Sequence, residues 1–150
     1  MNTLDQLTNV SLFYNMTSSS LLRLHGGFLI LLAVALTIGG FVGLTTAKGP
    51  FAWIVEAPIA APGLVQAYLL MPLIGFVLWF GSYRAEDTNI FHWLGMLAHM
   101  VPLGLLPVFW NILGAVGATE TAPTSVAIHG DWIVVEASSI WRLYRAAPHV

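Results

Sequence analysis

The sequence predicts an all-α membrane protein with three transmembrane helices, organised as a single membrane domain over residues 1–150. Of its 150 residues, 57% are hydrophobic and only 8% are charged, which is far from the balance of a soluble domain. Three stretches, at about residues 24–45, 64–80 and 90–116, contain no Asp, Glu, Lys or Arg. Each is long enough to cross a bilayer, which takes about 20 apolar residues per helix. We therefore expect a multi-pass integral membrane protein of a thylakoid or bacterial inner membrane.

The first helix follows a polar segment, residues 1–20, which we expect to form a surface arm. The serine run 18–20 supplies candidate N-cap residues for that helix. Within the helix, Ala35, Gly39 and Gly43 recur at every fourth position. A row of small side chains lets another helix approach closely, so this spacing predicts tight packing.

Prolines and aromatic residues define the elements that follow. Residues 47–62 combine aromatic and apolar side chains with prolines, a composition typical of a loop that lies at the membrane interface. Pro72 is expected to bend the second helix, and Pro102 and Pro107 to bend or break the third. The connection between the second and third helices is short, so these helices should be antiparallel.

From Gly117 onward the chain is polar, and residues 118–150 are expected to form an extramembrane tail. Two structures remain open for it. One is a small β-hairpin around residues 129–131. The other is an amphipathic surface helix with an apolar side formed by Ile133, Ala137, Ile140, Trp141 and Tyr144. Asp131 and Glu136 argue against a fourth transmembrane helix.

His25, His92 and His99 are the candidate cofactor-binding residues, because they lie in uncharged apolar helices. An imidazole in hydrocarbon needs a partner, and it serves well as the axial ligand of a metal in a flat ring. His92 and His99 lie seven residues apart and project from one helix face, with Gly95 between them leaving room for such a ring. Since they cannot both bind one ring, the sequence allows one bis-histidine haem that includes His25, or up to three singly ligated pigments. Hydrogen bonding of each histidine is the alternative.

Other chemistries find little support in the sequence. The five Lys and Arg form no basic stripe, so a nucleic-acid partner is not expected, and the absence of Cys excludes disulfides and iron–sulfur clusters. The uncharged spans offer no carboxylates or bases for a transport path. No Ser-His-Asp arrangement or His-Glu-x-x-His motif occurs, so we expect no enzymatic activity and no metal beyond that of a haem or chlorophyll.

One short run resembles a known family. Leu24-His25-Gly26-Gly27-Phe28-Leu29-Ile30 is similar to the start of the first membrane helix in the L subunit of photosystem I, which is also a three-helix protein of about this size. The resemblance implies a chlorophyll at His25 and implies nothing for His92 or His99. It covers about seven residues of the 150, and the family's early Gly-Pro after this run is absent.

Together these observations predict a small, non-catalytic membrane subunit of a bioenergetic complex, most consistent with a photosynthetic one. It would pack against other membrane subunits and lipids, bind chlorophyll through histidine, and contact carotenoid or quinone. Two alternatives stay open. One is a haem b membrane anchor of a respiratory oxidoreductase that reacts with quinone, in which His25 and a later histidine share the haem. The other is a purely structural or assembly protein whose histidines only form hydrogen bonds.

Overall fold

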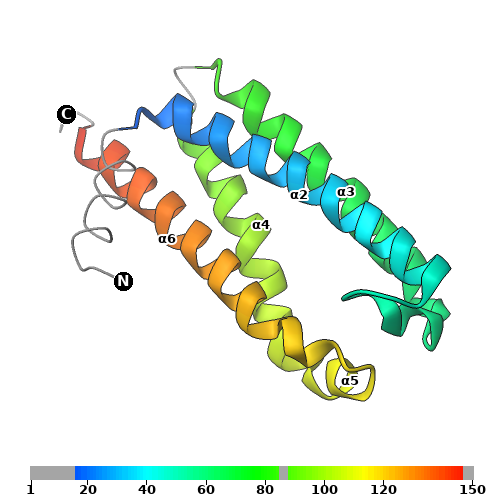
Figure 1. The fold of residues 1–150 in the computed structure, drawn as a ribbon. Coiled ribbons are helices and arrows are strands. Elements are labelled where there is room, and N and C mark those ends of the chain that lie inside the picture. Colours follow the sequence, from blue (N-terminus) through cyan, green and yellow to red (C-terminus); the bar gives the residue numbers. More distant parts are fainter. Residues whose placement is uncertain (1–15, 85–87, 147–150) are drawn as a thin grey trace, which may run out of the picture.

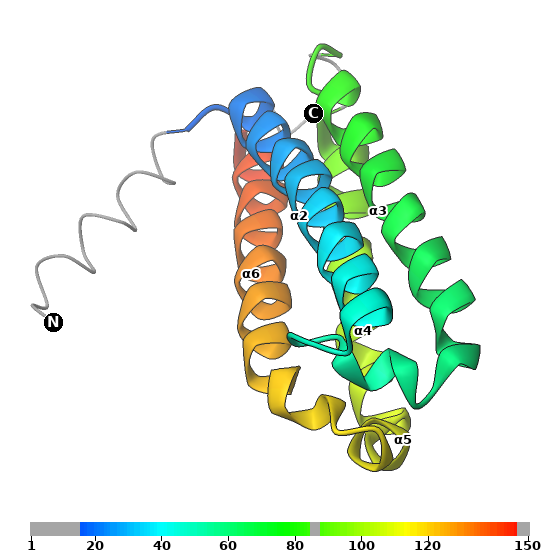
Figure 2. The same ribbon diagram turned by 45° about the vertical axis from the view of Figure 1, so that its right-hand side comes forward.

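The computed structural model describes residues 16–84 and 88–146, and this part of the chain is helical with no strand. Long helices lie side by side in an elongated bundle (Figure 1, Figure 2). They are α2 (Ser18–Thr46), α3 (Ala61–Gly81), α4 (Thr88–Val108) and α6 (Ala122–Ala146). Short helices occupy the connections: η1 (Ala52–Val55), η2 (Pro58–Ala60), α5 (Trp110–Ala115) and η3 (Ala118–Thr121). The predicted all-α fold is confirmed.

Three segments are long and apolar enough to cross a membrane: Ser18–Thr46, Pro58–Gly81 and Asn89–Val108. By length and composition, they confirm the three predicted transmembrane helices. Helix α6 is not among them, although it packs along α4 for much of its length (Figure 2). The bundle therefore has a fourth, less apolar member.

Helix α2 begins at Ser18, six residues before the predicted start. Its N-cap is Thr17, whose Oγ1 accepts a hydrogen bond from the backbone N–H of Ser20 at 3.2 Å. The prediction of a serine cap is wrong, because the serines lie in the first turn of the helix. Most of the predicted surface arm, residues 1–15, lies outside the described residues.

Glycines let α2 approach its neighbours closely at two places. A Cβ on Gly26 would lie 2.4 Å from the carbonyl oxygen of Gly75, so α2 and α3 meet backbone to backbone there. Further along α2, a Cβ on Gly43 would lie 2.5 Å from the carbonyl oxygen of Phe51, just before η1. Ala35, the first member of the predicted small-residue row, is exposed. The glycines of the row therefore pack as predicted, but against the connecting segment and not against another long helix.

The third predicted helix is divided, as its prolines indicated. Helix α4 ends at Val108, directly after Pro107, and α5 begins at Trp110. Proline has no N–H to donate and its ring crowds the preceding turn, so it interrupts the helical hydrogen bonds. The predicted interfacial loop 47–62 forms η1 and η2 and leads back into α3.

The tail predicted at 118–150 forms η3 and α6, so the hairpin alternative is wrong and the helix alternative is confirmed. The buried residues of α6 are Ala122, Glu136, Ser139 and Ile140. Three residues of the predicted apolar side, Ala137, Trp141 and Tyr144, are exposed instead. The physical reason is that Glu136 has buried polar partners on α2 and α4, which orient the helix. Residues 147–150 lie outside the described residues.

The bundle consists of two helix pairs. Helix α2 packs mainly against α3, and α4 packs mainly against α6, whereas the contacts of α4 with α2 and α3 are less extensive (Figure 2). An apolar core of Leu22, Leu29 and Leu78 joins α2 to α3. The histidines lie between the two pairs, where Phe91 and Leu94 of α4 also pack against this apolar core.

Candidate functional site

The three histidines predicted as cofactor ligands meet at one place. His25 comes from α2, and His92 and His99 come from α4; all three are at most 1% exposed. Glu136 of α6 lies among them and is 0% exposed. We call the full set of contacting polar side chains the histidine cluster: Ser18, His25, His92, His99, His129 and Glu136.

Two antiparallel helices, α4 and α6, supply four of the six residues of the histidine cluster, at the same spacing on each helix. His92 and His99 lie seven residues apart on α4, and His129 and Glu136 lie seven residues apart on α6. Seven residues are nearly two turns, so each pair projects from one face of its helix. Because the helices run in opposite directions, His99 meets His129 and His92 meets Glu136. The Nδ1 atoms of the two histidines are 2.8 Å apart, and Nδ1 of His92 donates to Oε2 of Glu136.

Helix α2 contributes the imidazole that joins these two pairs. Nδ1 of His25 donates to Oε1 of Glu136, and its Nε2 lies 2.8 Å from Nε2 of His99. The indole of Trp132 stacks on this imidazole, with ring centroids 4.0 Å apart and planes inclined by 12°. A Cβ on Gly95 would lie 3.0 Å from Nδ1 of His25. The room predicted beside Gly95 for a cofactor ring is therefore filled by the imidazole of His25.

The contacts form one unbranched chain with two ends. The Ser18 hydroxyl lies 2.6 Å from Nε2 of His92 and completes it on one side. The order of contact is Ser18, His92, Glu136, His25, His99 and His129. The two end residues are half-buried, whereas the four between them are 0–1% exposed. The chain therefore crosses the bundle interior and reaches its surroundings at both ends.

With Glu136 ionised, the hydrogen bonds have only one consistent set of directions. A carboxylate can only accept, so His25 and His92 each donate their Nδ1–H. In a neutral imidazole the other nitrogen then accepts, so Nε2 of His92 accepts from the serine hydroxyl. Likewise, Nε2 of His25 accepts from the Nε2–H of His99, and Nδ1 of His99 accepts from the Nδ1–H of His129. Neutral histidines and one carboxylate thus satisfy all these contacts. On both sides of Glu136, each hydrogen bond is donated in the direction of this carboxylate.

The histidine cluster as arranged here does not fit a haem or a chlorophyll. Both ring nitrogens of all three predicted ligands are hydrogen-bonded within the cluster, so none offers a free lone pair to an axial metal. A metal–imidazole bond is about 2 Å long, so two histidines on opposite sides of one metal need nitrogens about 4 Å apart. The Nε2 atoms of His25 and His99 are 2.8 Å apart. Among the described residues, no group of three or more His, Asp or Glu is arranged to hold a metal ion.

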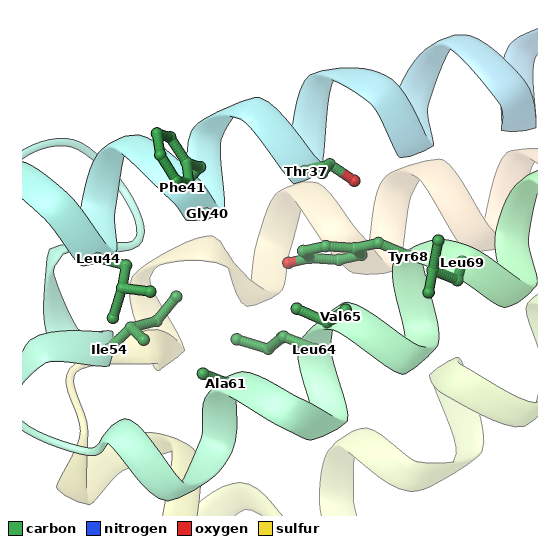
Figure 3. A pocket seen from close by; sticks show the side chains of 10 residues that line it. All are labelled: Thr37, Gly40, Phe41, Leu44, Ile54, Ala61, Leu64, Val65, Tyr68 and Leu69. Atoms are coloured by element: carbon green, nitrogen blue, oxygen red, sulfur yellow. The ribbon is translucent and has the colours of Figure 1, made fainter.

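Two hollows lie outside the histidine cluster. One is an apolar cavity of about 160 Å³ between α2 and α3, and the ring of Tyr68 lies across it (Figure 3). The other is an open groove of about 560 Å³, lined by Leu103, Leu106, Pro107, Trp110, Asn111 and Val126. Leu103 lies one helical turn beyond His99, and Val126 lies one turn before His129. The groove therefore begins close to where the chain of contacts ends.

The sequence identifies three of the six cluster residues and misses Glu136, His129 and Ser18. Glu136 and His129 belong to a segment that is polar on average, and this average places them in an extramembrane tail. The available signal is their spacing, because His129, Trp132 and Glu136 lie at positions i, i+3 and i+7 of one helix. This is the same seven-residue spacing that marks the histidine pair of α4.

Replacing Gly95 by alanine is expected to disturb the hydrogen bond between His25 and Glu136. The new Cβ would lie 2.9 Å from Oε1 of Glu136 and 3.0 Å from Nδ1 of His25, and both side chains are held by further hydrogen bonds. We expect a loss of about 1 kcal/mol in stability and altered ring-nitrogen chemical shifts of His25 by NMR. Gly104→Ala on the same helix, where nothing lies within 4 Å, is the control. Identical histidine shifts in both variants would contradict this geometry.

Comparisons with protein family models, curated proteins and solved structures find no match for this chain. The resemblance of residues 24–30 to the L subunit of photosystem I therefore stays a prediction, as does binding of chlorophyll or haem. Function has to be argued from the histidine cluster and from the helices that hold it.

Proposed function

We propose that this chain is a small membrane subunit of a bioenergetic complex that transfers protons through its helix bundle along the histidine cluster. The observation that carries the proposal is the unbroken series of side-chain contacts from Ser18 to His129, through buried imidazoles and one carboxylate. Ionisable residues within membrane helices usually face the bundle interior, and chains of Asp, Glu and His act as proton relays in pumps and transporters.

Each imidazole of the chain can bind a proton on one nitrogen and release one from the other. A proton that arrives at Nε2 of His129 releases the Nδ1 proton to His99. His99 then passes its Nε2 proton to His25, and the Nδ1 proton of His25 moves to Glu136. Every ring ends neutral in its opposite tautomer, and Glu136 ends as a carboxylic acid. To empty Glu136, His92 first changes to its Nε2–H tautomer. Its Nδ1 then accepts the carboxylic proton, its Nε2–H passes to the Ser18 hydroxyl oxygen, and that hydroxyl releases its own proton to the surroundings. Return of all rings to their first tautomers completes a cycle.

Helix α6 supplies the carboxylate that the three predicted spans lack. Those spans contain histidines but no Asp, Glu, Lys or Arg, whereas Glu136 and His129 enter the bundle from α6. The proposed membrane location is supported by the three helices that are long and apolar enough to cross a bilayer. A photosynthetic complex and a haem anchor remain predictions from the sequence, and the occupied histidine nitrogens give them no support.

Proton flux into lipid vesicles tests the relay directly. The purified chain is reconstituted with a pH-sensitive dye inside, and a potassium diffusion potential drives protons inward. We expect the internal pH to fall several-fold faster than in protein-free vesicles. Glu136→Gln should return the rate to near the protein-free value, because an amide does not take up a proton at the centre of the chain.

The control variant is Tyr144→Phe, which removes an exposed hydroxyl from the same helix. It should conduct like the unchanged protein. If Glu136→Gln vesicles conduct as fast as wild type while the variant remains folded, the proton-relay proposal is wrong.

A further inference from the structure

Helix α6 has an exposed face turned away from the histidine cluster. Its exposed residues, spaced three or four positions apart, are Thr124, Ala127, Asp131, Val134 and Ser138. This spacing places them along one side of the helix, and we call this side the outer face of α6. Asp131 forms no ion pair with another described residue. The outer face therefore presents a carboxylate and two hydroxyl groups to the surroundings of the bundle.

Asp131 lies within the apolar length of the neighbouring helix and not at its end. His129 contacts His99 at 2.8 Å, and Asp131 follows two residues later, about 3 Å along the helix axis. It is therefore level with the middle of the segment Asn89–Val108, which is apolar enough to cross a membrane. The large side chains that α4 exposes near this level are all apolar: Leu97, Met100 and Val101.

A carboxylate is strongly disfavoured against lipid, and membrane helices normally turn such a group toward a partner. We propose that the outer face of α6 binds a transmembrane helix of a different membrane protein, which pairs a Lys or Arg side chain with Asp131. The small side chains of Ala127 and Ser138 lie one or two turns away and allow a close approach of that helix. This inference rests on the membrane location proposed above, but not on the proton relay.

Charge favours a different protein over a second copy of this chain. Copies of one membrane protein insert in the same orientation, so Asp131 lies at the same depth in each. A symmetric pair joined through α6 would place the two carboxylates together. Lys48, Arg84, Arg142 and Arg145 lie away from this level. Arg142 is eleven residues further along α6, about 16 Å along the axis. Arg23 lies near it, two residues before His25 whose ring stacks on Trp132, but its guanidinium stands over the ring of Tyr83, 5.2 Å from the ring centre.

The test uses oligoleucine transmembrane peptides as probes. One peptide carries a single Lys at its centre, and the matched peptide carries Leu there. Energy transfer to the labelled full chain in phosphatidylcholine vesicles measures binding of each. We expect the Lys peptide to bind about three- to ten-fold more tightly than the Leu peptide. Asp131→Leu should abolish this preference while retaining helical content, because the replaced side chain is exposed.

Three outcomes would overturn the inference. Equal binding of both peptides by the wild-type chain removes the role of charge. Energy transfer between two labelled copies that disappears in Asp131→Leu identifies a second copy as the occupant. The chain has no cysteine, so Asp131→Cys introduces one thiol, and its labelling by a water-soluble maleimide in vesicles would place the outer face in water. That last result would refute the membrane location at this depth, whereas the flux of Glu136→Gln vesicles tests the relay separately.

Discussion

Replacement of Glu136 by alanine is expected to lower the free energy of unfolding by about 2–6 kcal/mol, since each of two buried N–H groups left without an acceptor costs about 1–3 kcal/mol. The carboxylate is 0% exposed and accepts hydrogen bonds from both His25 and His92. Without it, two buried N–H groups have no acceptor in an interior that is closed to solvent. Unfolding in mixed micelles with increasing dodecyl sulfate, followed by circular dichroism, measures the effect.

Two further variants separate this loss from ordinary packing. Glu136→Gln should cost only about 1 kcal/mol, because the amide oxygen accepts from one histidine and the amide N–H donates to the other after a change of tautomer. Val134→Ala removes a side chain that is 65% exposed on the same helix, and it should change stability by less than about 0.5 kcal/mol. If alanine and glutamine at position 136 cost the same, the hydrogen bonds are not what stabilises the bundle.

Replacement of Gly26 by alanine is expected to cost about 1–3 kcal/mol, the range for inserting volume into a packed interface. The new Cβ would lie 2.4 Å from the carbonyl oxygen of Gly75 and 3.0 Å from the backbone nitrogen of Trp79. Both neighbours are backbone atoms, which cannot change rotamer, so α2 and α3 have to move apart. The same micelle titration measures the loss, and tryptophan fluorescence should report the displacement of Trp79.

A double-mutant cycle shows whether the two glycines act at one contact. A Cβ on Gly75 would lie 2.7 Å from the carbonyl oxygen of Gly26. Once the helices have separated, the second alanine meets less resistance, so the double variant should cost clearly less than the sum of the single variants. Gly63→Ala, also on α3 with nothing within 4 Å, should be neutral or stabilising by up to about 1 kcal/mol. Strict additivity would argue against the backbone contact.

The helices were predictable because their signal is carried by long uncharged runs, and the break at Pro107 was predictable because proline acts locally. The start of α2 was not, since the polar serines continue the helix once Thr17 caps it. The burial of one face of the tail helix was not predicted, for a different reason. Mean hydropathy hides the fact that His129 and Glu136 share one face of α6, and only their partners on other helices explain why that face is buried.

The site was half predictable. Sequence reasoning placed His25, His92 and His99 at a functional centre, and the structure brings all three together. It left the hydrogen-bond partners of His99 open, and these are His25 and His129. Which histidines meet depends on the register between antiparallel helices, and no single helix contains that information.

The division of the bundle into two helix pairs has a consequence for biogenesis. Each pair joins helices that are neighbours in the chain or linked by a short corner, so each can form soon after its helices enter the membrane. The pairs then meet through His25 and its partners Trp132 and Glu136, and through Phe91 and Leu94 of α4, which pack against the core between α2 and α3. Docking must remove water from the imidazoles and from Glu136 at once. The histidine cluster therefore lies at the junction of the two helix pairs, and we expect it to close when they dock.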